Sequence, residues 1–238
     1  MRLLVSVANA VEARSALEGG ADIVDAKDPT RGALEAVSLG TFAAIHRACA
    51  GQVTLTAALG DTRSGPQSSG SVADFARAGA SLVKVGFADV TSPGAIASVL
   101  EAAIREGAGA AASPCGVIAV AYADADRVSA AAPGDVLAAA ADTGAAGVLL
   151  DTADKVGPGL CSLWSRDALE RWTASARRAG LLVAMAGRLS ADDIAWLVPL
   201  GVDIVGVRGA ACEAGRSSAI SARRVRTLRA RCRAMRRQ

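Results

Sequence analysis

One short segment is written four times along this chain, and its repetition limits the fold more than any other feature. Each copy places glycine at the end of a predicted helix and then enters a short apolar strand rich in β-branched residues. The copies begin at Gly20, Gly79, Gly144 and Gly201. Strands that alternate with helices in this way predict an α/β fold with a parallel sheet.

Reading the whole chain gives eight strand-then-helix units. Two of the predicted strands carry Asp25 and Lys84, and the others are Leu3–Val7, Val53–Ala57, Val117–Ala121, Val148–Asp151, Leu182–Met185 and Asp203–Val207. The predicted helices are Ala10–Glu18, Val37–Cys49, Val72–Ala78, Pro93–Glu106 closed by Gly107, Asp135–Asp142, Arg166–Ala179, Ala191–Leu197 and an Arg-rich helix over 216–238. This count predicts a TIM (β/α)8 barrel, a fold of typically ~250 residues, as one domain over residues 1–238. The first strand is not followed by Gly-x-Gly-x-x-Gly, which argues against a dinucleotide-binding sheet.

Charged residues occupy equivalent positions in the four copies. They stand at the fifth or seventh position after the first glycine and are Asp25, Lys27, Lys84, Asp151 and Arg208. Side chains alternate between the two faces of a strand, so this parity places all five on one face. In a barrel, catalytic groups lie at the carboxyl ends of the strands. Lys155, Asp61, Asp124 and Tyr122 also fall at or beyond strand ends, and Asp22 and Asp203 are expected at the opposite end as stability residues.

The scarcity of lysine points to amine chemistry. Of 26 basic residues only Lys27, Lys84 and Lys155 are lysines, and all three lie at or just beyond predicted strand ends. A guanidinium stays protonated, whereas a desolvated ammonium group can lose its proton and attack a carbonyl carbon. The residues alone therefore predict an imine-forming enzyme. Which neighbouring lysine or carboxylate moves protons stays open, because an adjacent cation and an adjacent anion shift an amine pKa in opposite directions.

Glycine turns follow the last two predicted strands, where barrels commonly bind phosphate through backbone N–H groups. They are Ala186-Gly187-Arg188 and Gly206-Val207-Arg208-Gly209. We expect Gly187, Arg188, Gly206, Arg208 and Gly209 to bind a substrate phosphate. The predicted substrate is a small phosphorylated carbonyl compound.

Composition excludes several other classes of protein. Hydrophobic residues make up 52% of the chain, yet no apolar run reaches the ~20 residues that span a bilayer, so we expect a cytoplasmic protein without membrane contact. Five scattered cysteines predict free thiols and no metal site. Residues 216–238 hold nine arginines and no acid, and subtracting their charge from the formal +3 leaves −6 for the rest. This tail lacks aromatic residues and carries an apolar stripe, which favours a solvated last helix over nucleic-acid binding.

Four longer motifs resemble the (5-formylfuran-3-yl)methyl phosphate synthases of methanofuran biosynthesis, a branch of one-carbon metabolism. They are residues 19–29, 122–128, 150–155 and 203–212, and the resemblance spans essentially the whole chain. It implies a TIM barrel that condenses two glyceraldehyde 3-phosphates into a furan aldehyde phosphate, releasing phosphate and water without a metal or organic cofactor. It also implies that Lys27 forms the Schiff base and Lys84 accepts a proton, with Lys155, Asp25 and Asp151 as supporting site residues.

Two departures and two alternatives accompany this resemblance. The polar region Thr62–Ser71, which is either a lid or an insertion, is shorter than in the family, so the details of a lid stay open. The Arg-rich end also departs from the family, so the contacts of a possible homo-oligomer stay open. One alternative is a Schiff-base aldolase or isomerase acting on another sugar phosphate. The other is a non-enzymatic binding protein that uses its basic C-terminal helix.

Overall fold

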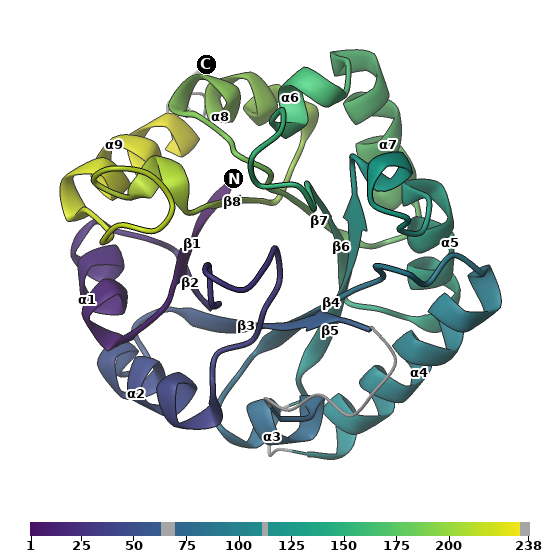
Figure 1. Cartoon of the computed structure of the whole chain (residues 1–238), viewed down its shortest axis with the longest axis horizontal. Helices are drawn as coiled ribbons and strands as arrows, with labels where there is room; N and C mark the ends of the chain where they lie inside the picture. Colours follow the sequence, from purple (N-terminus) through teal and green to yellow (C-terminus); the bar gives the residue numbers. More distant parts are fainter. Residues whose placement is uncertain (63–69, 111–113, 234–238) are drawn as a thin grey trace.

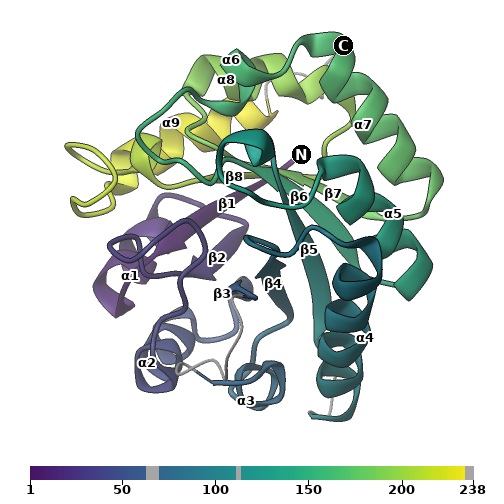
Figure 2. The same ribbon diagram turned by 45° about the vertical axis from the view of Figure 1, so that its right-hand side comes forward.

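The chain forms a closed barrel of eight parallel strands in the order β1 to β8, in a computed structural model that describes residues 1–62, 70–110 and 114–233. Figure 1 looks down the barrel and shows the helices as an outer ring, and Figure 2 shows them flanking the strands. The predicted TIM barrel is therefore confirmed. The strands are β1 (Arg2–Val7), β2 (Ile23–Ala26), β3 (Thr54–Asp61), β4 (Leu82–Gly86), β5 (Gly116–Tyr122), β6 (Gly147–Asp151), β7 (Leu182–Met185) and β8 (Ile204–Val207).

Helices follow the strands around the barrel, and several of them begin at a side-chain cap. Asn9 caps the first helix, and Ser71 and Ser190 each form a reciprocal capping box with an aspartate three residues later. The α-helices are α1 (Ala10–Glu18), α2 (Leu39–Cys49), α3 (Val72–Arg77), α4 (Pro93–Gly109), α5 (Pro133–Thr143), α6 (Leu160–Leu163), α7 (Arg166–Arg178), α8 (Ala191–Leu197) and α9 (Ala222–Arg233). Short 3₁₀ turns are η1 (Ala125–Arg127), η2 (Val198–Leu200) and η3 (Gly209–Ala211). Among the described helices, none is both long and apolar enough to cross a bilayer.

Most observed boundaries lie within two residues of the predicted ones, helix α6 was not predicted, and three boundaries differ in ways that affect the packing or the site. Helix α4 does not end at Gly107 but continues to Gly109. Gly107 instead allows close packing, since a Cβ there would lie 2.4 Å from the Cys115 carbonyl oxygen. Strand β3 continues to Asp61. Helix α9 begins at Ala222, so Arg216 lies in the loop before it. The polar region Thr62–Ser71, expected to be either a lid or an insertion, falls mostly on residues 63–69, which lie outside the described part of the chain.

Apolar side chains form two clusters, one inside the barrel and one outside it. An inner cluster includes Leu4, Ile23, Ile118, Leu149 and Ile204, which point into the barrel from different strands. A larger outer cluster fills the space between the sheet and the helices. The inner cluster closes the lower part of the barrel, so any cavity at the carboxyl ends of the strands has an apolar floor.

The amino-terminal ends of two repeated strands are held by aspartate side chains. Asp22 accepts a hydrogen bond from the backbone N–H of Leu3 at 2.8 Å, and Asp203 accepts one from Val183 at 2.9 Å. Arg229 of α9 pairs with Asp22 at 2.5 Å. The predicted position of both aspartates at the amino-terminal end of the barrel is confirmed, and α9 docks against the barrel with Val225, Leu228 and Cys232 buried.

Candidate active site

The repeated strands β2, β4, β6 and β8 deliver the predicted charged residues to one end of the barrel. A cavity of about 430 Å³ opens there. Its wall includes predicted charged residues and glycines from the strand ends and the following loops: Lys27, Lys84, Asp151, Lys155, Gly187, Arg188, Gly206, Arg208 and Gly209. Its floor is formed by Leu4, Leu82, Ile118, Leu149, Leu182 and Ile204. The predicted charged residues of the wall therefore lie together at one end of the barrel, as strand parity and the alternation of strands predicted.

Asp25 is the buried carboxylate at the centre of this site. It accepts hydrogen bonds from Ser6 Oγ at 2.9 Å and Thr56 Oγ1 at 2.7 Å, and it pairs with Lys84 Nζ at 2.5 Å. The side chain has no exposed surface. With three donors on two oxygens, the Asp25 side chain is held rigidly, and it fixes the position of the Lys84 amine.

Lys27 extends from the end of β2 into the cavity. Its pKa is lowered from 10.5 to about 7, chiefly because burial disfavours the charged form. Asp151 and Asp25 oppose this change by their negative charge, whereas Lys155 and Lys84 reinforce it. Lys27 is therefore an amine that is about half neutral near pH 7, lying between two lysine–carboxylate pairs.

The second of these pairs lies after β6. Lys155 Nζ donates to Asp151 Oδ1 at 2.7 Å and also to the Thr152 carbonyl oxygen. Burial alone would raise the pKa of Asp151, but the charges of Lys155 and Lys27 and the hydrogen bonds from Lys155 and the Thr152 N–H lower it below its ordinary value. Asp151 is thus an ionised carboxylate that faces both amines.

Asp124 positions the loop that carries Lys155 rather than facing the cavity. Its two carboxylate oxygens accept hydrogen bonds from the backbone N–H groups of Ala153 and Asp154, both at 2.8 Å. The side chain is buried. Because Lys155 is the next residue along, Asp124 fixes the direction from which that amine enters the site.

Asp61 and Tyr122 form a separate buried contact between β3 and β5. The Tyr122 hydroxyl donates to Asp61 Oδ1 at 2.7 Å, and the backbone N–H of Ala88 donates to the same oxygen. Burial first, and then the charge of Asp61, raises the pKa of Tyr122 well above its usual value. Neither residue belongs to the cavity wall, so within the described structure this pair braces the strand ends.

The glycine turns after β7 and β8 lie at the cavity mouth. Gly187 has φ +105°, and a Cβ there would lie 3.0 Å from Thr152 Cγ2, so a side chain would strain both backbone and packing. Arg188 follows with φ +56°, and its guanidinium donates to the carbonyl oxygens of Val156 and Gly157. The turn after β7 is therefore tied to the loop after β6.

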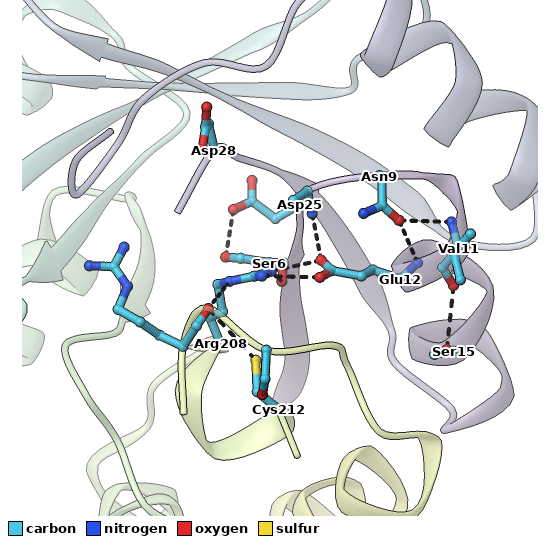
Figure 3. Close-up of polar contacts among 12 residues, drawn as sticks. Ser6, Asn9, Val11, Glu12, Ser15, Asp25, Asp28, Arg208 and Cys212 are labelled. Carbon is cyan, nitrogen blue, oxygen red and sulfur yellow. Dashed lines mark hydrogen bonds and ion pairs between the residues drawn. The ribbon is translucent and has the colours of Figure 1, made fainter. Parts of the chain in front are cut away.

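Arg208 reaches the cavity wall, but its guanidinium is already bonded. It donates to both carboxylate oxygens of Glu12, at 2.8 and 3.1 Å, and to the Ser6 carbonyl oxygen at 3.0 Å. Figure 3 shows the Arg208 side chain directed at Glu12, with Ser6 beside Asp25. Both partners of this pair are buried. The expected phosphate contact of Arg208 thus competes with a bidentate carboxylate that the sequence analysis did not identify.

Four contributing residues were not identified from the sequence. Ser6 and Thr56 face Asp25 from the neighbouring strands, and the strand parity that located Asp25 would also have placed them inward. Glu12 lies in the first turn of α1. An acid at this position of a helix is usually exposed and stabilises the helix end, so its sequence position did not indicate a buried role. Arg216 lines the cavity, but it was counted among the arginines of the last helix.

Known proteins resemble this chain along most of its length. The family model described as 4-HFC-P synthase matches residues 3–229. The (5-formylfuran-3-yl)methyl phosphate synthase of Methanothermobacter thermautotrophicus is 36% identical over 219 residues, covering 90% of this chain and 91% of that protein. The synthase of the same name from Methanosarcina barkeri is 34% identical over 236 residues, covering 98% and 100%.

Solved structures resemble the chain in fold. The 3-hexulose-6-phosphate synthase of Salmonella typhimurium has a TM-score of 0.70 at 18% identity, covering 98% of this chain and 99% of that one. Phosphoribosyl anthranilate isomerase from Thermus thermophilus has a TM-score of 0.64 at 19% identity, covering 99% and 100%. At these identities the likeness concerns the barrel architecture.

Proposed function

The chain belongs to the (5-formylfuran-3-yl)methyl phosphate synthase family of methanofuran biosynthesis, and on this premise we propose that it works through an imine on Lys27. Its substrates in this proposal are two molecules of glyceraldehyde 3-phosphate, and the reaction is that of a carbon–oxygen lyase that releases phosphate and water. The product is the furan aldehyde phosphate after which the family is named.

The observation that carries this proposal is the Lys27 amine, whose pKa is about 7 in an apolar cavity. Its neutral nitrogen attacks the aldehyde carbon of one substrate, and loss of water leaves a protonated imine. The positive imine nitrogen withdraws electrons and makes the adjacent C–H acidic. A base that removes this proton gives an enamine, whose carbon attacks the aldehyde of the second molecule.

The two lysine–carboxylate pairs supply the proton transfers in this scheme. Lys84 first passes a proton to Asp25 across their contact of 2.5 Å, and its neutral amine then removes the proton from the carbon next to the imine. Lys155 and Asp151 lie on the other side of Lys27 and transfer protons to the oxygens that leave as water. Each pair is close to neutral overall, which supports proton exchange within it at little electrostatic cost.

The turns after β7 and β8 bind a phosphate group in this proposal. Gly187, Gly206 and Gly209 line the cavity mouth without side chains, which allows a phosphate to approach the backbone N–H groups closely. Arg188 adds a positive charge beside them. Arg208 contributes through the position of its loop, because Glu12 occupies its guanidinium.

Reductive trapping tests this function. Borohydride with glyceraldehyde 3-phosphate should give a covalent adduct whose mapped peptide contains Lys27, and Lys27→Arg should abolish both the adduct and furan formation while keeping the charge. Lys155→Arg is the matched control, which should slow turnover and still form the Lys27 adduct. An adduct on another lysine, or furan production by Lys27→Arg at the normal rate, would refute the assignment.

A further inference from the structure

Among the residues that the structure describes, three arginines line the cavity, and one of them extends toward the loop that follows Lys27. Arg188 is bonded to carbonyl oxygens of the loop after β6, and Arg208 is bonded to Glu12. Arg216 lies in the loop between β8 and α9, and its side chain belongs to the cavity wall. The feature that requires explanation is the fixed position of this third guanidinium.

The backbone of Arg216 is anchored by the buried arginine beside it. Arg208 Nε donates to the Arg216 carbonyl oxygen at 2.7 Å. A Cβ at Gly209 would lie 3.8 Å from Arg216 Cβ, so the turn after β8 packs directly against this residue. The Glu12–Arg208 pair therefore fixes both the strand end and the starting point of the Arg216 side chain.

From that point the Arg216 side chain crosses the cavity mouth. Its Nη2 donates to the Gly32 carbonyl oxygen at 3.1 Å, and Gly32 lies in the loop five residues beyond Lys27. Burial, and next the charge of Arg208, lowers the pKa of Arg216, while Asp151 opposes this change. A guanidinium nevertheless stays charged throughout the physiological range.

The hydrogen-bond partner of the Arg216 side chain carries no charge. In the described part of the chain, the acceptor bonded to its side chain is a neutral carbonyl oxygen, whereas Arg208 has a carboxylate. A half-buried guanidinium with free donors in a fixed fork is suited to a phosphate group. The proposed reaction also requires two phosphorylated molecules in one cavity, and the turns after β7 and β8 account for one phosphate.

We propose that Arg216 binds the phosphate group of the molecule that Lys27 captures. The guanidinium reaches the loop that leaves the Lys27 strand, whereas the glycine turns follow β7 and β8. The cavity then holds two phosphate-binding positions, one for each substrate molecule. This inference rests on the proposed imine function, and it adds a residue that selects phosphorylated over unphosphorylated aldehydes.

The test compares imine capture of two aldehydes by the same variants. The rate of borohydride trapping on Lys27 is measured against concentration for glyceraldehyde 3-phosphate and for glyceraldehyde. In Arg216→Gln the half-saturating concentration of the phosphorylated aldehyde should rise about tenfold or more, the value of one charge-assisted contact. Capture of glyceraldehyde should change less than twofold. Arg216→Lys should recover part of the loss, and Arg223→Gln, which removes an exposed arginine of α9, should behave as the parent protein.

Two outcomes of this comparison overturn the inference. Unchanged preference for the phosphorylated aldehyde in Arg216→Gln would mean that phosphate binds elsewhere, and an equal loss for both aldehydes would mean a purely structural role. If the parent protein forms no Lys27 adduct, the imine proposal fails instead. The inference is then decided by thermal unfolding with inorganic phosphate, where Arg216→Gln must lose part of the phosphate-dependent rise in Tm.

Discussion

Neutralising Asp151 should move the pH profile of imine capture toward acid. At pH 7 an ordinary lysine of pKa 10.5 is only ~0.03% neutral, whereas Lys27, with a pKa of about 7, is about half neutral, a gain on the order of 10³ in reactive amine. The negative charge of Asp151 is the largest influence that raises this pKa. Asp151→Asn therefore lowers the pKa of Lys27, and the expected displacement is about one pH unit.

The assay is the single-turnover rate of imine capture with glyceraldehyde. An unphosphorylated aldehyde is preferable, because a phosphate monoester itself titrates at about pH 6. In the parent protein the rate should rise through about pH 7 and then level off. Asp151→Asn should reach its plateau at lower pH, and Lys155→Met should reach it at higher pH, because Lys155 lowers the pKa of Lys27. A parent profile that rises only near pH 10, or an alkaline displacement in Asp151→Asn, would refute the reasoning.

Three further perturbations test other parts of the structure. Glu12→Ala leaves the buried Arg208 charge unpaired and should cost about 3–5 kcal/mol in the free energy of unfolding, measured by urea titration; a loss below ~1 kcal/mol would contradict this. Asp124→Ala releases the loop before Lys155 and should lower kcat about tenfold or more while Lys27 still traps aldehyde, and loss of trapping as well would argue against a positioning role. Lys27→Met should stabilise the fold by about 4 kcal/mol at pH 7, because the unfolded chain binds the Lys27 proton more tightly, and this gain should shrink as pH rises toward 10.5.

The sequence was informative wherever the chemistry depends on strand parity. The repeated glycine-to-strand segments placed Asp25, Lys27, Lys84 and Asp151 on the inner face of even-numbered strands, and the structure has them there. Position along a strand fixes the direction of a side chain, so these residues could be located without knowing their neighbours.

The remaining features depend on contacts between distant parts of the chain. Glu12 and Arg208 are 196 residues apart, and nothing in the local pattern around Glu12 distinguishes it from an exposed acid at a helix start. Arg216 was missed because it was grouped with the arginines of the predicted last helix, although the six residues that follow it contain no arginine. Tyr122 and Asp61 were placed correctly at strand ends, but only coordinates show that they bond to each other.

The pairing of β1 with both β2 and β8 has a consequence for synthesis on the ribosome. One edge of β1 pairs with residues 23–26, which are synthesised soon after it, but the other edge pairs with residues 204–207, which are synthesised near the end. Until then the growing polypeptide carries unsatisfied amide and carbonyl groups along an apolar ribbon, which is a template for misassembly. Protection of nascent chains by a chaperone should therefore matter most just before the eighth strand emerges.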